Sequence, residues 1–284
     1  MEHVRPPPVE NRLSPPGRSG QVVLLARREA AAKLTSFWFF LVAAILSLMA
    51  FFHGAGFQHV FETESVLVTA DPLRGLNAAI VTFLGAVLGL RLATSLSAER
   101  EHGTLEVLLA GPVTWTALVV AKYLSELVVL VGLTGLYGAY IVLAQPLGPG
   151  LTPLRSLLPI LLALIHVLPL MAAGLLVSAW AGSVRLAVVS YLAILSLLSL
   201  YEGLLGLLRG MDAETMSLFA LYLRATLDGI EPLMHLVSPV SGIASVVAGV
   251  LSDDGQATGP WGQSIVLSLV LIGLARLVAG VKGA

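Results

Sequence analysis

Ionisable residues inside apolar stretches are the most chemically informative feature of this sequence. Arg91, Lys122 and Glu126 each stand among runs of leucine, valine and alanine. A charge surrounded by hydrocarbon is costly, so it pairs with an opposite charge, reaches the membrane interface or takes part in transport. Glu126 has two candidate partners, Lys122 one helical turn away and Arg91 on the preceding apolar stretch. We therefore expect an intramembrane charge pair among these three residues, with snorkelling to the interface as the alternative for the two cations.

His166 lies midway along a later apolar stretch. Two interpretations are open: the imidazole lines a substrate path, or it makes a hydrogen bond to a neighbouring helix. Three further histidines, His53, His59 and His235, show no metal-ligand spacing, and the chain has no cysteine. The sequence therefore predicts no metal site.

Nucleotide hydrolysis needs a phosphate-binding loop, whose pattern is Gly-x-x-x-x-Gly-Lys followed by Ser or Thr. The three lysines of this chain are followed by Leu34, Tyr123 and Gly283, so none fits the pattern. A Gly-x-Ser-x-Gly nucleophile elbow is also absent from the sequence. We expect no enzymatic activity and no cofactor on this chain, and any ATP hydrolysis must then occur on another polypeptide.

The elements that position these residues are long apolar blocks. The chain is 57% hydrophobic and 12% charged, whereas soluble domains are roughly 45–50% apolar and about 25% charged. A block must cover a hydrocarbon core of roughly 30 Å to span the bilayer. The sequence predicts an all-α polytopic membrane protein whose six spans lie at about 37–53, 76–97, 115–144, 157–180, 186–208 and 265–280.

The remaining segments complete one transmembrane domain over residues 21–284, after a Pro-rich disordered tail at 1–20. Residues 21–36 form a basic helix that we expect to lie on the cytosolic membrane surface. Residues 209–263 are too apolar for a plain loop, so we expect external re-entrant or interfacial helices before the last span. The net charge is −1 and indicates no nucleic-acid partner.

Basic residues give the orientation, because they accumulate on the cytosolic side of membrane proteins. With the N-terminus inside, eight of them fall at or near cytosolic ends, whereas most acidic residues of the loops fall outside. We expect both termini in the cytosol and the protein in the inner, plasma membrane. The eight are Arg27, Arg28, Lys33, Arg100, Lys122, Arg185, Arg276 and Lys282.

A short helix is expected in the cytosolic connection between the second and third spans. Gly103 breaks the preceding helix, Thr104 can cap a new one, and Glu106 stands in its first turn, where the helix dipole favours an acid. Gly111-Pro112 ends it. Its apolar face consists of Leu105, Leu108 and Leu109. Such a face can dock into a groove of another protein or rest on lipid headgroups, and the pattern alone leaves both open.

Several motifs in and around this connection are specific when taken together. They are Glu99-Arg100-Glu101-His102-Gly103-Thr104-Leu105-Glu106, Leu108-Leu109, Pro112-Val113 and Ala121-Lys122-Tyr123-Leu124, with Ser238-Pro239 and Gly249-Val250-Leu251 before the last span. With the basic helix and the six spans, these motifs make the chain resemble the ABC-2-type transporter permeases over most of its length.

The resemblance implies an ATP-driven transporter in which the short cytosolic helix is the coupling helix. It implies two ABC-type ATP-binding subunits that hold ATP and magnesium, and a second permease chain that makes a homo- or heterodimer. Export is the commoner direction in that family, and no substrate is implied. The coupling residues carried over are Glu99, Arg100, Glu101, Gly103, Thr104, Leu105, Glu106, Leu108, Leu109 and Pro112.

Two other classes of function are weighed against this one. A secondary transporter would show an inverted repeat or discontinuous helices at the membrane midplane, and neither is evident in the pattern. A membrane scaffold that transmits force to an extracytoplasmic partner would favour a larger external domain.

Small residues spaced four apart also occur in two spans. They predict close helix packing, either within the chain or between two chains. They are Gly85 and Gly89 in the second span, and Gly174, Ser178 and Gly182 in the fourth.

Overall fold

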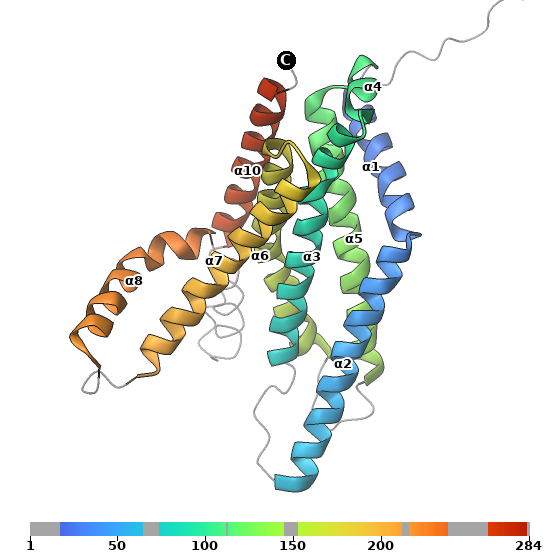
Figure 1. Cartoon of the computed structure of the whole chain (residues 1–284). Helices are drawn as coiled ribbons and strands as arrows, with labels where there is room; N and C mark the ends of the chain where they lie inside the picture. Colours follow the sequence, from blue (N-terminus) through green and yellow to red (C-terminus); the bar gives the residue numbers. More distant parts are fainter. Residues whose placement is uncertain are drawn as a thin grey trace, which may run out of the picture.

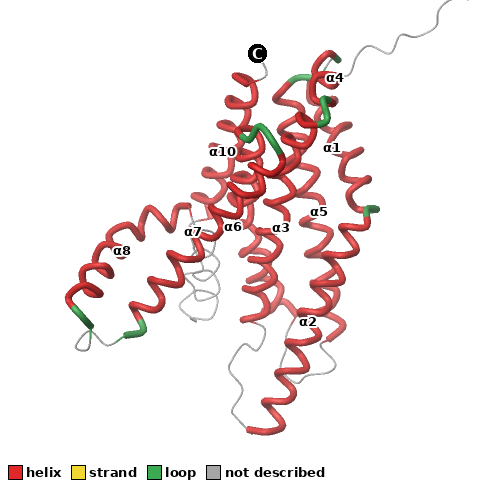
Figure 2. The backbone as a smooth tube through the Cα atoms, in the orientation of Figure 1, coloured by secondary structure: helices red, strands yellow, loops and turns green. Residues whose placement is uncertain are grey.

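The computed structural model describes residues 18–64, 74–111, 113–144, 153–211, 216–237 and 261–282, and in these ranges the regular structure is entirely helical (Figures 1 and 2). The predicted all-α class is therefore confirmed. Helices satisfy their own backbone hydrogen bonds, which hydrocarbon cannot do for them. The helices are α1 (Arg18–Leu34), α2 (Phe37–Glu64), α3 (Arg74–Glu101), α4 (Thr104–Ala110), α5 (Trp115–Ala144), α6 (Pro153–Trp180), α7 (Val184–Arg209), α8 (Leu218–Val237) and α10 (Trp261–Lys282).

Five helices in the described ranges are long and apolar enough to cross a membrane, namely α2, α3, α5, α7 and α10. Each of the six predicted spans falls within a helix, and α2, α3, α6 and α10 extend at least three residues beyond the predicted bounds at one end or both. In α6 the apolar stretch within the described residues is Leu164–Trp180, which is shorter than the apolar helices α3, α5, α7 and α10 and the apolar stretch of α2. The chain is thus a multi-pass helical membrane protein.

The centre of the bundle is the contact between α3 and α6, and α6 also packs along α10. A Cβ on Gly174 would lie 2.0 Å from the carbonyl oxygen of Gly89, so the two backbones touch there. Ser178 Oγ accepts hydrogen bonds from the backbone N–H groups of Leu96 and Ser97, at 2.8 and 3.1 Å. The small residues left open whether they pack within the chain or between two chains. Gly89, Gly174 and Ser178 pack within the chain, between α3 and α6.

Gly85 belongs to the same contact, because a Cβ there would meet Leu170 at 2.8 Å. Gly182 does not, since no heavy atom lies within 4 Å of the position that its Cβ would take.

The N-terminal helix α1 lies alongside the first half of α5, and α2 continues in the same direction beside the rest of α5 (Figure 1). Charged side chains of α1 bond to α5, and the expected position of this helix on the membrane surface stays a prediction. The helix begins at Arg18, three residues before the start that we expected for the transmembrane domain. Residues 1–17 lie outside the described part.

The α7–α8 hairpin leans away from the bundle (Figure 1). Its two helices are joined by Arg209, whose Nη2 lies 2.8 Å from Asp228 Oδ1 and 2.6 Å from Glu231 Oε2. The opposite side of α8 exposes Leu218, Phe219 and Tyr222. Helix α8 lies within residues 209–263, the segment for which we expected external helices. The rest of that prediction concerns residues 240–251 and the motifs Ser238-Pro239 and Gly249-Val250-Leu251, which lie outside the described residues.

Figure 1 places α4, the beginning of α1 and the C-terminal end of α10 at one end of the bundle. The short connection and the two ends of the described chain therefore share a side of the molecule. This is the end at which the charged residues of α3 and α5 accumulate, so the candidate site is built there.

Candidate functional site

Helix α4 follows α3 after a sharp turn at Gly103. Gly103 has φ 68°, a left-handed conformation that favours glycine, so the predicted helix break is confirmed. The predicted cap is wrong, because Gly103 occupies the N-cap position and no side chain caps the helix. The Thr104 hydroxyl instead donates to the carbonyl of Glu99 at 3.1 Å and ties α4 back to α3. Pro112 lies outside the described residues.

The leucine face of α4 packs on its own chain. Leu105 is 5% exposed, and Leu108 and Leu109 are partly buried against the same hydrophobic core. The face that we expected to offer to a partner or to lipid is therefore occupied inside this molecule. Val107, by contrast, is 74% exposed and stands beside the exposed Glu106. The exposed face of α4 is therefore this second one, which the leucine spacing had not singled out.

Three consecutive residues at the end of α3 each bond to a different helix or turn. Glu99 accepts a short hydrogen bond from Lys122 of α5. Arg100 donates to the carbonyl of Ala181 at 2.6 Å, just beyond α6. Glu101 Oε2 accepts the backbone N–H of Val184 at the start of α7, at 3.1 Å. A cation near a helix C-terminus and an acid at an N-terminus both complement the helix dipole. The segment leading into α4 is thus attached to α5, α6 and α7.

Six charged residues form what we call the charge ladder, which joins α1, α3 and α5. It comprises Glu29 and Lys33 on α1, Arg91 and Glu99 on α3, and Lys122 and Glu126 on α5. The two α5 residues are one helical turn apart and each is flanked by opposite charges from both neighbouring helices. The ladder therefore has two groups of three charges, which we call rungs: one has a cation between two anions, and the other has an anion between two cations.

In the first rung Lys122 lies between two carboxylates. Its Nζ is 2.8 Å from Glu29 Oε1, and it also contacts Glu99 Oε1. In the second rung Glu126 lies between two cations: its Oε1 is 3.0 Å from Lys33 Nζ and 3.4 Å from Arg91 Nε. An anion–cation–anion triad thus stacks on a cation–anion–cation triad.

The ladder is buried at its centre. Glu126 is 2% exposed and Lys122 is 8% exposed, while the four outer side chains are partly covered. Ser125 bridges the rungs, since its Oγ accepts a hydrogen bond from Lys33 at 2.6 Å and lies 3.2 Å from Glu29 Oε2. Buried charges persist only when they are paired and hydrogen-bonded. Three cations face three carboxylates, so every charge is paired, although Oε2 of Glu99 and Oε2 of Glu126 are buried without a hydrogen-bond partner.

Of the two candidate partners of Glu126, Arg91 on α3 contacts its carboxylate, whereas Lys122 on the same helix as Glu126 does not. Lys122 pairs with carboxylates that were not considered. Sequence reasoning missed Glu29 and Lys33, which we expected among lipid headgroups. Their i, i+4 spacing put them on one helix face, but nothing in the pattern said that this face meets α5.

His166 is 1% exposed, and its Nδ1 lies 2.8 Å from Ser264 Oγ of α10. Of the two interpretations, the structure contains the interhelical hydrogen bond. Lining of a substrate path remains a prediction. Within the described ranges, no three histidine, aspartate or glutamate side chains come together to hold a metal ion.

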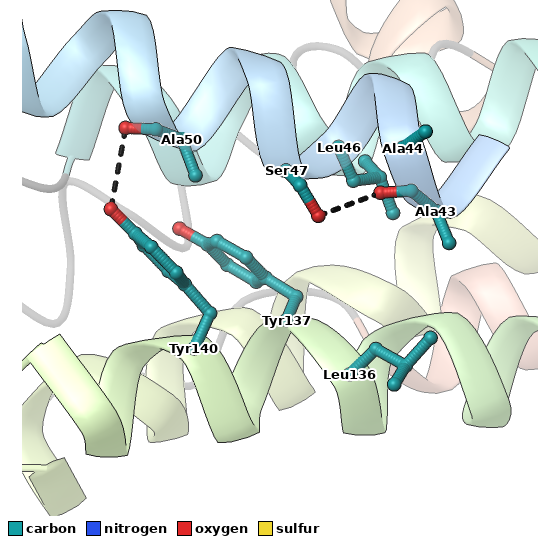
Figure 3. A pocket seen from close by; sticks show the side chains of 8 residues that line it. All are labelled: Ala43, Ala44, Leu46, Ser47, Ala50, Leu136, Tyr137 and Tyr140. Carbon is teal, nitrogen blue, oxygen red and sulfur yellow. Dashed lines mark hydrogen bonds between the residues drawn. The ribbon is translucent and has the colours of Figure 1, made fainter. Parts of the chain in front are cut away.

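A cavity of about 270 Å³ lies between α2 and α5, away from α4 (Figure 3). Alanines and Ser47 of α2 line one side, and Leu136, Tyr137 and Tyr140 of α5 line the other. The tyrosine hydroxyls are already bonded, Tyr140 to the carbonyl of Ala50 at 3.3 Å and Tyr137 to Asn77 Oδ1 at 2.6 Å. The lining contains no acid–base pair that could perform catalysis.

A family model described as "ABC-2 family transporter protein" matches residues 23–281. The match covers most of the chain, and the protein belongs to this family. Its members are membrane transport subunits that are not catalytic themselves, and membership implies association with an ABC-type ATP-binding subunit. A search of curated proteins found no similar sequence.

Proposed function

We propose that this ABC-2 family member is the membrane-spanning subunit of an ATP-driven exporter. Two copies of an ATP-binding subunit bind ATP and magnesium, and two permease chains form the path through the membrane. The lack of a phosphate-binding lysine in this chain supports the division of labour, because the energy must then come from a partner.

The observation that carries the proposal is the attachment of the α3–α4 segment to the spans. Glu99, Arg100 and Glu101 bond to α5, to the end of α6 and to the start of α7. A force applied to α4 therefore reaches α3 through the short turn at Gly103, and from α3 it reaches α5, α7 and the turn that follows α6. This is the mechanical property that a coupling element requires, and it supports coupling between a partner's ATP cycle and rearrangement of the spans.

The surface proposed for the ATP-binding subunit is the exposed side of α4 with Glu101, His102 and Thr104 beside it. Val107 is its apolar centre and Glu106 lies at its edge. A small apolar anchor with a polar rim is the usual anatomy of a protein interface. The leucines act indirectly by holding α4 against the bundle.

The proposed topology has six spans with both termini in the cytosol. Helix α6 is the fourth crossing in chain order, beside the five helices α2, α3, α5, α7 and α10, and α8 lies on the external side. The distribution of basic residues supports this orientation, as does the position of α4 and both ends of the described chain at one end of the bundle.

The test is co-expression with an ATP-binding subunit from the same source, followed by purification and measurement of ATPase stimulation. Val107→Asp should weaken association about tenfold or more, because it buries a charge at the centre of an interface. Met211→Asp is the matched control, since Met211 is also an exposed apolar residue but follows α7 at a distance from α4. Equal association of the wild type and the Val107→Asp variant would overturn the docking surface.

A further inference from the structure

Helix α1 contributes an internally neutral pair to the charge ladder. Glu29 and Lys33 are four residues apart on α1, and Lys33 Nζ lies 3.5 Å from Glu29 Oε2. The other four ladder residues pair without them, as Lys122 with Glu99 and Arg91 with Glu126. Every member of the ladder therefore keeps an opposite charge whether or not α1 is present.

We infer that α1 is a releasable strap on α5, which detaches by exchange of ion-pair partners as the transporter works. On release, Glu29 and Lys33 turn to each other, and the central residues of both rungs keep their α3 partners. The inference rests on the proposed function for its place in the transport cycle, but the strap itself is a property of this chain.

The exchange removes the usual obstacle to moving a charged helix. Withdrawing one partner from a buried pair leaves an uncompensated charge, which is strongly unfavourable. Here no carboxylate or cation is left alone in either position of α1. The docked state keeps extra hydrogen bonds through Ser125, whereas the released state gains water around α1, so neither state dominates by charge alone.

The apolar part of the α1–α5 contact is made mainly by small side chains. Ala26 and Ala30 are buried in it and Leu34 packs against the hydrophobic core, whereas Val23 and Leu24 are exposed on α1. Burial of apolar surface contributes in proportion to area. The ion pairs of Glu29 and Lys33 are therefore a large part of what holds α1 in place.

A joint lies directly after the ladder residues of α1. The helix ends at Leu34, and Ser36 Oγ donates to the carbonyl of Lys33 at 2.6 Å and accepts the N–H of Phe39 at 3.4 Å. The Thr35 hydroxyl donates to the carbonyl of Ala31 at 3.0 Å. These side chains satisfy backbone groups at the end of one helix and the start of the next. The helix is interrupted at Thr35 and Ser36, so we place the pivot of α1 at these two residues.

The ladder also connects the strap to α4. Glu29 and Glu99 contact the same ammonium group, that of Lys122, so a movement of Glu99 shifts the group that Glu29 binds. The backbone of Glu99 accepts the hydroxyl of Thr104, the first residue of α4. Displacement of α4 therefore acts on the residue that shares Lys122 with α1.

The experiment uses the full chain in lipid nanodiscs, with spin labels on Leu24→Cys and Val131→Cys. The chain has no native cysteine, and both positions are exposed on α1 and α5. The unmodified ladder should give one narrow distance distribution by pulsed electron paramagnetic resonance. Glu29→Lys with Lys33→Glu leaves the net charge of α1 unchanged but opposes like charges across the contact, and should add a longer-distance population. Arg27→Gln with Arg28→Gln, which removes exposed charges of α1, should change nothing.

Thermal stability tests the partner exchange separately. Glu29→Ala alone leaves three cations for two carboxylates and should lower Tm, whereas Glu29→Ala with Lys33→Ala restores the balance and should recover most of the loss. Lowering of Tm in the double variant by the sum of the two single effects would overturn the exchange. An unchanged distance distribution in the charge-reversed variant would overturn the strap.

A final arm uses the complex with the ATP-binding subunit, trapped with ATP and vanadate, and should show a larger longer-distance population than the nucleotide-free complex. An unchanged distribution in a complex that hydrolyses ATP would make the strap static and overturn its role in the cycle. Failure of the wild-type chain to bind an ATP-binding subunit would instead count against the proposed function, and the two measurements on the chain alone would still decide the strap.

Discussion

The charge ladder and the Arg209 cluster of the α7–α8 hairpin use the same chemistry in different surroundings. Both join helices through cations and carboxylates at hydrogen-bond distance. Glu126 of the ladder is 2% exposed, whereas the side chain of Arg209 is 43% exposed. Water screens an exposed pair and replaces a lost partner, but a buried charge has no such substitute. Burial, rather than the number of ion pairs, should decide what each cluster contributes.

The largest effect should come from removal of the central carboxylate of the ladder. Glu126→Ala leaves Lys33 and Arg91 without the buried anion between them, a loss of about 3–5 kcal/mol that should lower Tm by more than about 8 °C. The measurement is thermal unfolding of the purified protein in detergent. Glu106→Ala is the matched control, because Glu106 is exposed on α4. Similar Tm values for these two variants would show that the ladder is not a stabilising core.

A second contrast concerns glycines of the α3–α6 contact and glycines of the α7–α8 hairpin. Gly174→Ala places a methyl group 2.0 Å from the carbonyl oxygen of Gly89, so α3 and α6 must separate, at a cost of about 1–3 kcal/mol. Gly203 and Gly229 of the hairpin have no heavy atom within 4 Å of an added Cβ. Their alanine variants should unfold at the wild-type temperature or slightly above, because alanine favours helix. A loss as large in the hairpin variants would contradict the open arrangement of α7 and α8.

The smallest effect should follow loss of the hairpin cation. Arg209→Ala frees Asp228 and Glu231 at the surface and should lower Tm by less than about 2 °C. Raising the salt concentration should shrink the difference further, since exposed pairs are screened. Melting curves at low and high salt measure both quantities. A drop as large as that of Glu126→Ala would show that exposure does not distinguish the two clusters.

The α4 segment shows how far pattern reasoning reaches. The break at Gly103 follows from the residue type, because glycine alone takes a left-handed turn at little cost. The shared face of Leu105, Leu108 and Leu109 follows from the helical period. Which neighbour that face meets does not follow, and the structure turns it onto the bundle and leaves Val107 outside. Periodicity defines faces of a helix, but only packing assigns them to a partner.

The ladder shows the complementary limit. Arg91, Lys122 and Glu126 stand out because they interrupt apolar runs. The sequence therefore predicted that they would form ion pairs, without specifying every partner. Glu29 and Lys33 lie in a polar segment where charges are unremarkable. Their part in the ladder depends on α1 lying along α5, a contact between residues about 90 positions apart that no local pattern specifies.

The sequence by itself determined that this chain is a helical membrane protein. Apolar blocks of this length are unfavourable in water, and in lipid their backbone N–H and C=O groups must form hydrogen bonds within the helix. It also determined the position of the break before α4 and the motifs that identify the family. Only the tertiary structure decided which charges share a rung, which face of α4 is free and which glycines touch. Those outcomes depend on how helices that are distant in the chain pack together. The free energy of that packing depends on both helices of each contact, so the sequence of one helix does not specify it.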